Sequence, residues 1–163
     1  VERIAERDID TEFGPFRLYC YEDHVNSTVH LALVRGNPRV QTAPLVRVHL
    51  KETVRDLIGE IEEGQSWSLR GAMQRVAHEG AGIIVLLRPE ESPFDIAEAV
   101  RTTARPHHGP NSPRGAQVLR TYGIGAQILR ECGVHKMRLM GNPRRMPSMT
   151  GYGLEITGYI PKE

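Results

Sequence analysis

The sequence predicts an α/β domain in which helices cover both faces of one sheet. Along the chain, the apolar pattern switches between the two-residue repeat of strands and the longer repeat of helices. Gly82–Leu87 is a continuous apolar run, which is typical of a central strand covered on both faces. A length of 163 residues suits one domain with a proper hydrophobic core.

The first third of the chain is expected to form three strands. Phe16–Tyr21 alternates apolar and polar side chains, as a half-buried strand does. Thr28–Arg35 is the second strand, and Asp23–Ser27 makes a hairpin-like turn between these two. Pro44–Leu50 is the third. Before them, residues 1–11 are highly charged and indicate a linker or N-terminal arm, so the domain is placed at residues 12–163.

Apolar stripes and capping residues predict the helices. Glu52–Glu63 is expected to be helical, and Ser66–His78 is expected to form a second helix. Ser92 and Pro93 are a favourable opening for a third, as the cap and the first helical residue. The side chains expected to face inward from the first of these helices are Val54, Leu57, Ile58 and Ile61.

The last third of the chain is expected to begin with an irregular loop at Arg105–Arg114, which is rich in proline. A helix follows and ends at Gly133, a residue suited to a left-handed cap. Lys136–Met140 and Leu154–Ile160 are the last two predicted strands, separated by a break at Asn142-Pro143.

Composition excludes several classes of partner. The formal net charge of +1 gives no large basic surface for nucleic acid. No apolar run approaches the roughly 20 residues that a membrane span needs, and the charged first residues are unlike a signal peptide. Cys20 and Cys132 both lie in apolar contexts, which indicates buried thiols in a reducing cytoplasm.

A series of motifs in one order resembles GTP cyclohydrolase II over nearly the whole chain. They are FGPFRLYCYED (13–23), HLALVRG (30–36), PLVRVH (44–49), VAHEGAGIIVLLR (76–88), YGIGAQIL (122–129), MRLMGNPRR (137–145) and GYGLEI (151–156). The resemblance implies a GTP cyclohydrolase II-like layered sandwich with a mixed sheet, and a homodimer. It also implies covalent fusion behind a 3,4-dihydroxy-2-butanone 4-phosphate synthase domain, with residues 1–14 as the junction.

The zinc site that the resemblance implies is not supported by the residues present. The family has three zinc-binding cysteines after the RVH strand, and these positions fall on Glu52, Glu63 and Gln65. Two carboxylates and an amide form no zinc-thiolate site. Cys20 and Cys132 stand elsewhere in the motif order. We therefore expect no zinc and no other cofactor.

The resemblance also implies a nucleotide-binding loop after the central strand. Arg88 and Glu90 match that loop, but its glycine and arginine are replaced by Glu91 and Ser92. Pro89 stiffens the loop, and an added acid would repel a triphosphate. This loop therefore predicts weaker GTP binding than the family pattern implies.

A catalytic carboxylate is also replaced. The family's acid before the YGIGAQIL helix falls on Val118, which cannot transfer a proton, whereas the arginine two residues later is kept as Arg120. Arg144 and Arg145 match basic positions. The adjoining His107 and His108 favour a solvated loop over a metal site, because no third ligand accompanies them.

Three functions follow as alternatives. The leading hypothesis is a domain of a riboflavin biosynthesis protein that has no cyclohydrolase activity and acts as a structural or regulatory appendage to a fused synthase. A zinc-independent hydrolase or cyclohydrolase would instead use Arg120 with Glu52 or Glu63. A sensing module would bind phosphate or a nucleotide weakly without turnover. The residues left for binding an anion or a nucleotide are Arg47, Arg88, Glu90, Arg120, Arg144 and Arg145.

Overall fold

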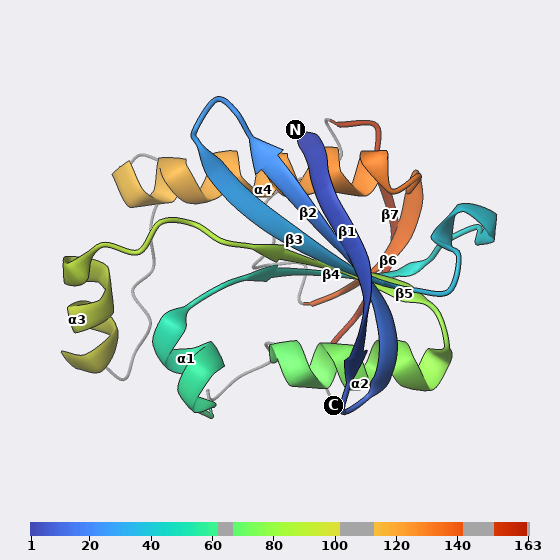
Figure 1. The fold of residues 1–163 in the computed structure, drawn as a ribbon, viewed down its shortest axis with the longest axis horizontal. Coiled ribbons are helices and arrows are strands. Elements are labelled where there is room, and N and C mark those ends of the chain that lie inside the picture. Colours follow the sequence, from blue (N-terminus) through green and yellow to red (C-terminus); the bar gives the residue numbers. More distant parts are fainter. Residues whose placement is uncertain (62–66, 102–112, 142–151, 163) are drawn as a thin grey trace.

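The computed structural model describes residues 1–61, 67–101, 113–141 and 152–162. Within them, one sheet has the strand order β1-β2-β3-β5-β4-β6-β7 (Figure 1). The strands are β1 (Glu2–Thr11), β2 (Gly14–Asp23), β3 (Thr28–Arg35), β4 (Leu45–Leu50), β5 (Gly82–Leu87), β6 (Lys136–Met140) and β7 (Glu155–Ile160). The helices are α1 (Thr53–Ile58), α2 (Leu69–Glu79), α3 (Pro93–Arg101) and α4 (Pro113–Glu131), with a 3-10 turn at η1 (Pro38–Val40).

The sheet is mixed, as predicted. Strands β1, β2, β3 and β5 are antiparallel neighbours, whereas β5, β4, β6 and β7 run parallel. The parallel strands β4, β5 and β6 end at Leu50, Leu87 and Met140, so their carboxyl ends share one edge of the sheet. The loops that leave this edge carry most of the candidate functional residues.

Helices α4 and α2 cover opposite faces of the sheet (Figure 1), and each face has its own apolar core. Successive residues of β5 alternate between the two cores: Ile83 and Val85 pack with α4, and Ile84 packs with α2. All three are fully buried. The continuous apolar run in the sequence therefore has the cause that was predicted, a central strand covered on both sides.

Two glycines of the α4 region fit the helix to its surroundings. At Gly125, a Cβ would lie 3.2 Å from Cδ1 of Leu87, so a larger residue would require the Leu87 side chain to shift. Gly133 has φ +85° and follows the end of the helix, where the Val134 N–H donates to the carbonyl of Leu129 at 3.0 Å. This is the left-handed cap expected from the sequence.

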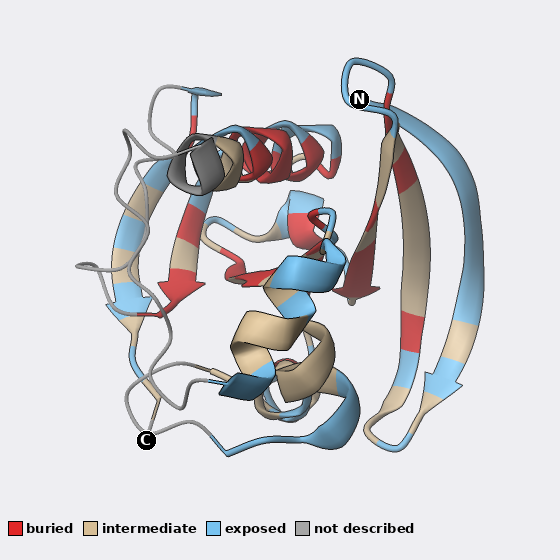
Figure 2. Cartoon of the chain, turned by 90° about the vertical axis from the view of Figure 1, so that its left-hand side faces the viewer, coloured by how far each residue is buried: buried red, intermediate tan, exposed pale blue. Residues whose placement is uncertain are grey.

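Residues 2–11 form a strand, whereas the charged sequence indicated a linker or arm. β1 pairs with β2 along its whole length, with a register shift around Ile4. It is the outermost strand, and most of its side chains are exposed (Figure 2). An edge strand with little to bury needs no alternating apolar pattern, so its composition resembles that of a solvated segment.

The predicted helix at Glu52–Glu63 is shorter than expected, and its apolar stripe does not face inward. Gly59, with φ +80°, ends α1 after Ile58. Leu57, Ile58 and Ile61 are 82%, 79% and 90% exposed. The reason is positional, because α1 lies beyond the carboxyl edge of the sheet and beside α3, where no strand face is available to cover it (Figure 1).

In the described residues, no helix combines the length and the apolar character needed to cross a membrane.

Candidate functional site

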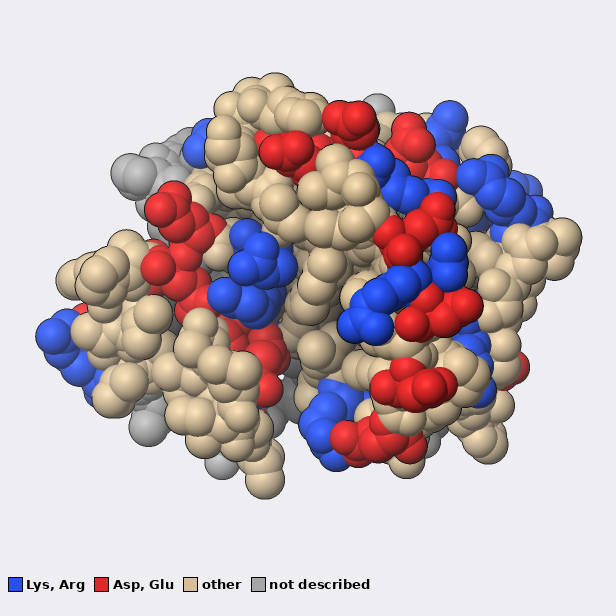
Figure 3. Space-filling model, in the orientation of Figure 1, with Lys and Arg blue, Asp and Glu red and all other residues tan. Residues whose placement is uncertain are grey.

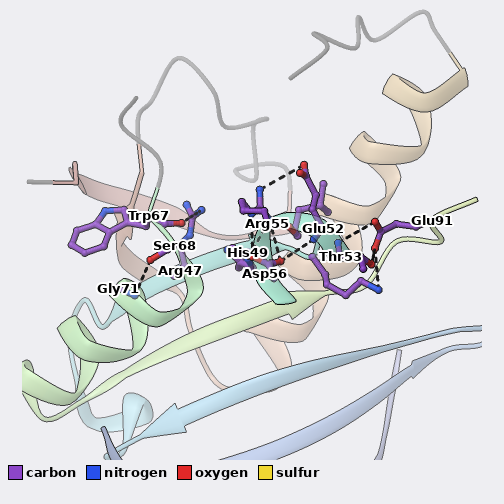
Figure 4. Close-up of polar contacts among 12 residues, drawn as sticks. Arg47, His49, Glu52, Thr53, Arg55, Asp56, Trp67, Ser68, Gly71 and Glu91 are labelled. Carbon is purple, nitrogen blue, oxygen red and sulfur yellow. Dashed lines mark hydrogen bonds and ion pairs between the residues drawn. The ribbon is translucent and has the colours of Figure 1, made fainter. Parts of the chain in front are cut away.

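The candidate site lies where the chain leaves the carboxyl ends of β4 and β5. The connection after β4 passes through α1 to α2, which covers one face of the sheet, and the connection after β5 passes through α3 to α4, which covers the other face. In α/β sheets, such a reversal between neighbouring strands opens the crevice in which ligands bind. In this chain, polar side chains from the two connections contact one another at this edge (Figure 4).

Arg47 is committed to backbone contacts. Its side chain leaves β4 on the α2 face, donating from Nη1 to the carbonyl of Met140 at 3.1 Å and from Nη2 to that of Trp67 at 3.0 Å. Burial lowers the pKa of Arg47 to about 10, so the guanidinium remains charged at neutral pH. Among the described residues, its buried Nε has no hydrogen-bond partner. Trp67 packs against the core of the α2 face.

Asp56 is the centre of a hydrogen-bond network at the end of β4. Its carboxylate accepts from His49 Nε2 at 3.0 Å, from the Glu52 N–H at 2.8 Å and from Arg55 Nε at 3.1 Å. Burial acts to raise the pKa of Asp56, but the hydrogen bonds from His49 and Arg55 outweigh it and hold that pKa well below its usual value. Asp56 is therefore a carboxylate at all working pH values.

His49 is fully buried next to this carboxylate. Burial lowers the pKa of His49, although the Asp56 hydrogen bond opposes this, so the ring is neutral in the folded state. Its Nδ1 has no partner in the described part of the chain. Since an unpaired lone pair costs less than an unpaired N–H, we assign the proton to Nε2, which donates to Asp56.

Glu91 closes the crevice between the two loops. Its carboxylate accepts from the Thr53 N–H at 3.1 Å and from Thr53 Oγ1 at 2.7 Å, and it forms an ion pair with Lys51 at 3.1 Å. Burial acts to raise the pKa of Glu91, but these contacts hold it below its usual value. Glu91 was expected to repel a phosphate, but Lys51 neutralises its charge. Its observed role is to fasten the loop after β5 to the start of α1.

The remaining candidate residues do not join this network through any contact found in the described residues. Arg88 donates from Nη1 to the carbonyl of Val29 at 3.1 Å, on the far side of β5. Glu90 is exposed in the same loop, and Arg120 is exposed on α4. Arg144 and Arg145 lie outside the described residues, as do His107 and His108. An anion site made of these arginines therefore stays a prediction.

His30 was missed in the sequence analysis and holds the nucleotide-loop residue Arg88. The Arg88 N–H donates to His30 Nδ1 at 2.9 Å, and His30 Nε2 lies 3.0 Å from Thr28 Oγ1. Burial lowers the pKa of His30, with Arg88 adding to this and Asp23 opposing it. The only sequence signal was a histidine inside an apolar strand, and this is insufficient to identify its partner on another strand.

Of the three zinc positions that the resemblance implied, the structure describes one, Glu52, which carries a carboxylate in place of a thiol. Of the three positions, Glu63 and Gln65 lie outside the described residues, and the Glu52 carboxylate lies 3.6 Å from Arg55 Nη1. Across residues 1–61, 67–101, 113–141 and 152–162, no cluster of three or more His, Cys, Asp or Glu side chains is arranged to hold a metal ion. Cys20 and Cys132 are both free thiols. Cys132 lies instead against the Tyr21 hydroxyl, at 3.4 Å.

The surface above this region mixes both charges and shows apolar side chains beside them (Figure 3). The fold and the site therefore define an α/β domain with a network of partly buried polar side chains at the carboxyl edge of its sheet. The sequence profile of GTP cyclohydrolase II matches residues 2–161, and the chain belongs to that family. The match includes β1, so the family's domain extends over the segment expected to be a linker.

Known proteins with similar sequences are longer than this chain. It is 40% identical to a 3,4-dihydroxy-2-butanone 4-phosphate synthase of Pseudomonas aeruginosa, over all of this chain and 44% of that protein. It is 35% identical to riboflavin biosynthesis protein RibBA of Chlorobium phaeovibrioides, over all of this chain and 42% of that protein.

A solved structure agrees with the fold. The crystal structure of RibBX, a two domain 3,4-dihydroxy-2-butanone 4-phosphate synthase from A. baumannii, is 31% identical to this chain with a TM-score of 0.61. The match covers 97% of this chain and 39% of the RibBX chain. The chain thus spans less than half the length of these relatives and is similar to one part of each.

The role of Glu91 gives a first prediction. Glu91→Ala is expected to lower the free energy of unfolding by about 1–3 kcal/mol, because Thr53 and Lys51 lose a half-buried acceptor. Backbone amides of residues 53–58 should exchange with solvent faster, since α1 loses its tie to the loop after β5. Chemical denaturation and hydrogen exchange measure the two effects. An exposed glutamate on α3 supplies the control: Glu98→Ala removes a surface ion pair with Arg101 and is expected to cost about 0–1 kcal/mol. Equal effects from the two variants would contradict the role given to Glu91.

Proposed function

We propose that this chain is the GTP cyclohydrolase II-like part of a cytoplasmic riboflavin biosynthesis protein, without cyclohydrolase activity of its own. It acts there as a structural or regulatory appendage to a fused 3,4-dihydroxy-2-butanone 4-phosphate synthase. The observation that carries this proposal is the ion pair between Glu52 and Arg55, at a position where the family resemblance calls for a zinc-binding thiolate.

Two further observations support the absence of activity. Val118 is half-buried on α4, at the position the resemblance gives to a catalytic acid, and its side chain cannot exchange a proton. The crevice at the sheet edge is closed by the contacts between Glu91 and Thr53. The P. aeruginosa relative and RibBX are both named as the synthase, which supports the second half of the proposal.

The decisive assay is formate release from GTP. We expect the chain to release no formate above a control without protein, with or without added zinc, and elemental analysis after dialysis against a mild chelator to find far less than one zinc per chain. The single substitution Glu52→Cys should restore neither activity nor zinc, because one thiolate is too few ligands for a tetrahedral site. Formate production by the unmodified chain would refute the proposal.

The appendage role is tested in the longer protein. The reading frame upstream of Val1 is expected to encode the synthase. Removing residues 1–163 from that protein should then change the stability, the assembly or the regulation of the synthase, while its chemistry persists. A truncated protein that equals the full-length protein in all three properties would exclude the appendage role.

The assembly of the isolated chain is a separate proposal. We expect a homodimer, so light scattering should report about 37 kDa, twice the 18.3 kDa of one chain. A mass near that of one chain at micromolar concentration would contradict it.

A second candidate function, weak phosphate or nucleotide sensing, is favoured by one observation. Arg47 is a buried cation that forms no ion pair with a carboxylate in the described part of the chain. Guanidinium groups bind phosphate with paired hydrogen bonds, so a millimolar, salt-sensitive affinity for pyrophosphate is expected, about 4 kcal/mol. Calorimetry at low salt tests this, and unchanged heat in Arg120→Ala would remove Arg120 from the site.

A further inference from the structure

Arg55 lies at the meeting point of the polar groups that close the end of β4. The side chain is 17% exposed. It donates from Nε to Asp56 Oδ1 at 3.1 Å, and Nη2 lies 3.3 Å from His49 Nε2 and donates to the carbonyl of Leu50. Nη1 faces Glu52 Oε1 at 3.6 Å. Nη2 also donates to Asp56 Oδ2 at 3.3 Å, so the guanidinium contacts groups of the β4 end and of the α1 start together (Figure 4).

The groups around Arg55 require a cation. Two carboxylates, Glu52 and Asp56, and the Leu50 carbonyl oxygen converge within one turn of chain, and like-charged groups at this separation repel strongly when partly desolvated. His49 cannot neutralise them, because burial lowers its pKa and keeps the ring uncharged. The guanidinium is charged at every working pH, and its planar fork can reach several acceptors at once.

We propose that Arg55 is the permanent cation of this site. Its guanidinium lies between the carboxylates of Glu52 and Asp56, where a cation that bridged them would bind, and it joins the start of α1 to the end of β4 as a bound ion would. The site is therefore closed to metal and complete without it. This inference deepens the proposed function, because it gives the physical reason for the expected absence of zinc.

The experiment is chemical rescue of an Arg55→Ala variant of the intact chain. Loss of one partner from a buried charge network of this kind should lower the melting temperature by about 6–12 °C. Methylguanidinium at 10 mM should recover at least half of that loss by filling the cavity. The matched control is Arg17→Ala, which removes an exposed arginine paired with Glu6 and Asp8. It should shift the melting temperature by less than about 2 °C, with no rescue.

Further arms cover the other outcomes. If Arg55→Ala does not fold, folding that depends on methylguanidinium supports the proposal, and Arg55→Gln provides the melting curve. A loss no larger than that of Arg17→Ala, or a loss that methylguanidinium does not reverse, overturns it. The proposal is also overturned if zinc raises the melting temperature of the unmodified chain and Glu52→Ala abolishes that rise, because the site would then be open to metal. Formate release would refute the proposed function without affecting these measurements.

Discussion

Asp56→Ala is expected to lower the free energy of unfolding by about 3–5 kcal/mol, one of the largest effects of any single substitution at this site. The carboxylate accepts from His49, from Arg55 and from the backbone N–H of Glu52. With alanine at position 56, all of these donors lose their acceptor. His49 is 1% exposed and the Arg55 side chain is 17% exposed, so water replaces that acceptor poorly. The cost is thus that His49, Arg55 and the Glu52 N–H stay partly desolvated without an acceptor, in addition to the lost attraction between Asp56 and Arg55.

Chemical denaturation measures this prediction, and two variants control for it. Asp56→Asn keeps the size of the side chain and one acceptor oxygen but loses the charge, so its cost should be smaller, about 1–3 kcal/mol. Glu98→Ala removes an exposed carboxylate paired with Arg101 and should cost about 0–1 kcal/mol. If Asp56→Ala costs no more than Glu98→Ala, the network does not stabilise the fold.

The parts of the fold that sequence reasoning predicted are those in which burial enforces a pattern. Gly82–Leu87 is apolar throughout because both faces of β5 are covered. Gly133 follows the end of α4, where the backbone adopts the left-handed conformation that glycine favours. β1 was missed because an exposed edge strand places no apolar demand on its sequence. The stripe on α1 was misinterpreted for the opposite reason: its apolar residues have a helical spacing, but the helix lies beyond the sheet.

The candidate site was only partly accessible from sequence. The substitutions at Glu52 and Glu91 were visible as departures from a motif, and their chemical consequence could be stated without coordinates. The new partners of these residues could not be predicted from the sequence. Thr53 and Glu91, for example, are 38 residues apart in sequence and meet only when β4 and β5 pair. Arg55 passed unnoticed for the same reason. A guanidinium on a short helix has many possible partners, and only the fold shows that it points back to β4.

Acidification is expected to destabilise the fold as pH falls below about 6.5, the pKa of an unfolded histidine. Burial lowers the pKa of both His30 and His49 in the folded state, so each binds its proton more readily when unfolded. Their contribution to stability is complete above the unfolded pKa of about 6.5 and is lost as pH falls toward the lower folded value. Linkage limits this slope to about 1.4 kcal/mol per pH unit for each histidine, or about 2.7 for both.

Denaturation at a series of pH values tests this slope, and side-chain amides supply matched variants. Asparagine at position 30 keeps an acceptor near the place of Nδ1, which faces Arg88, and glutamine at position 49 keeps a donor near the place of Nε2, which faces Asp56. His30→Asn and His49→Gln should each remove about half of the slope, and His135→Gln, at an exposed position, should leave it unchanged.

Below about pH 4.5, Asp56 and Glu91 add a second loss, since their pKa values are lowered by folding. A stability that is flat from pH 7 to pH 5 would mean that neither histidine is held neutral, and that the closed site at the end of β4 admits water.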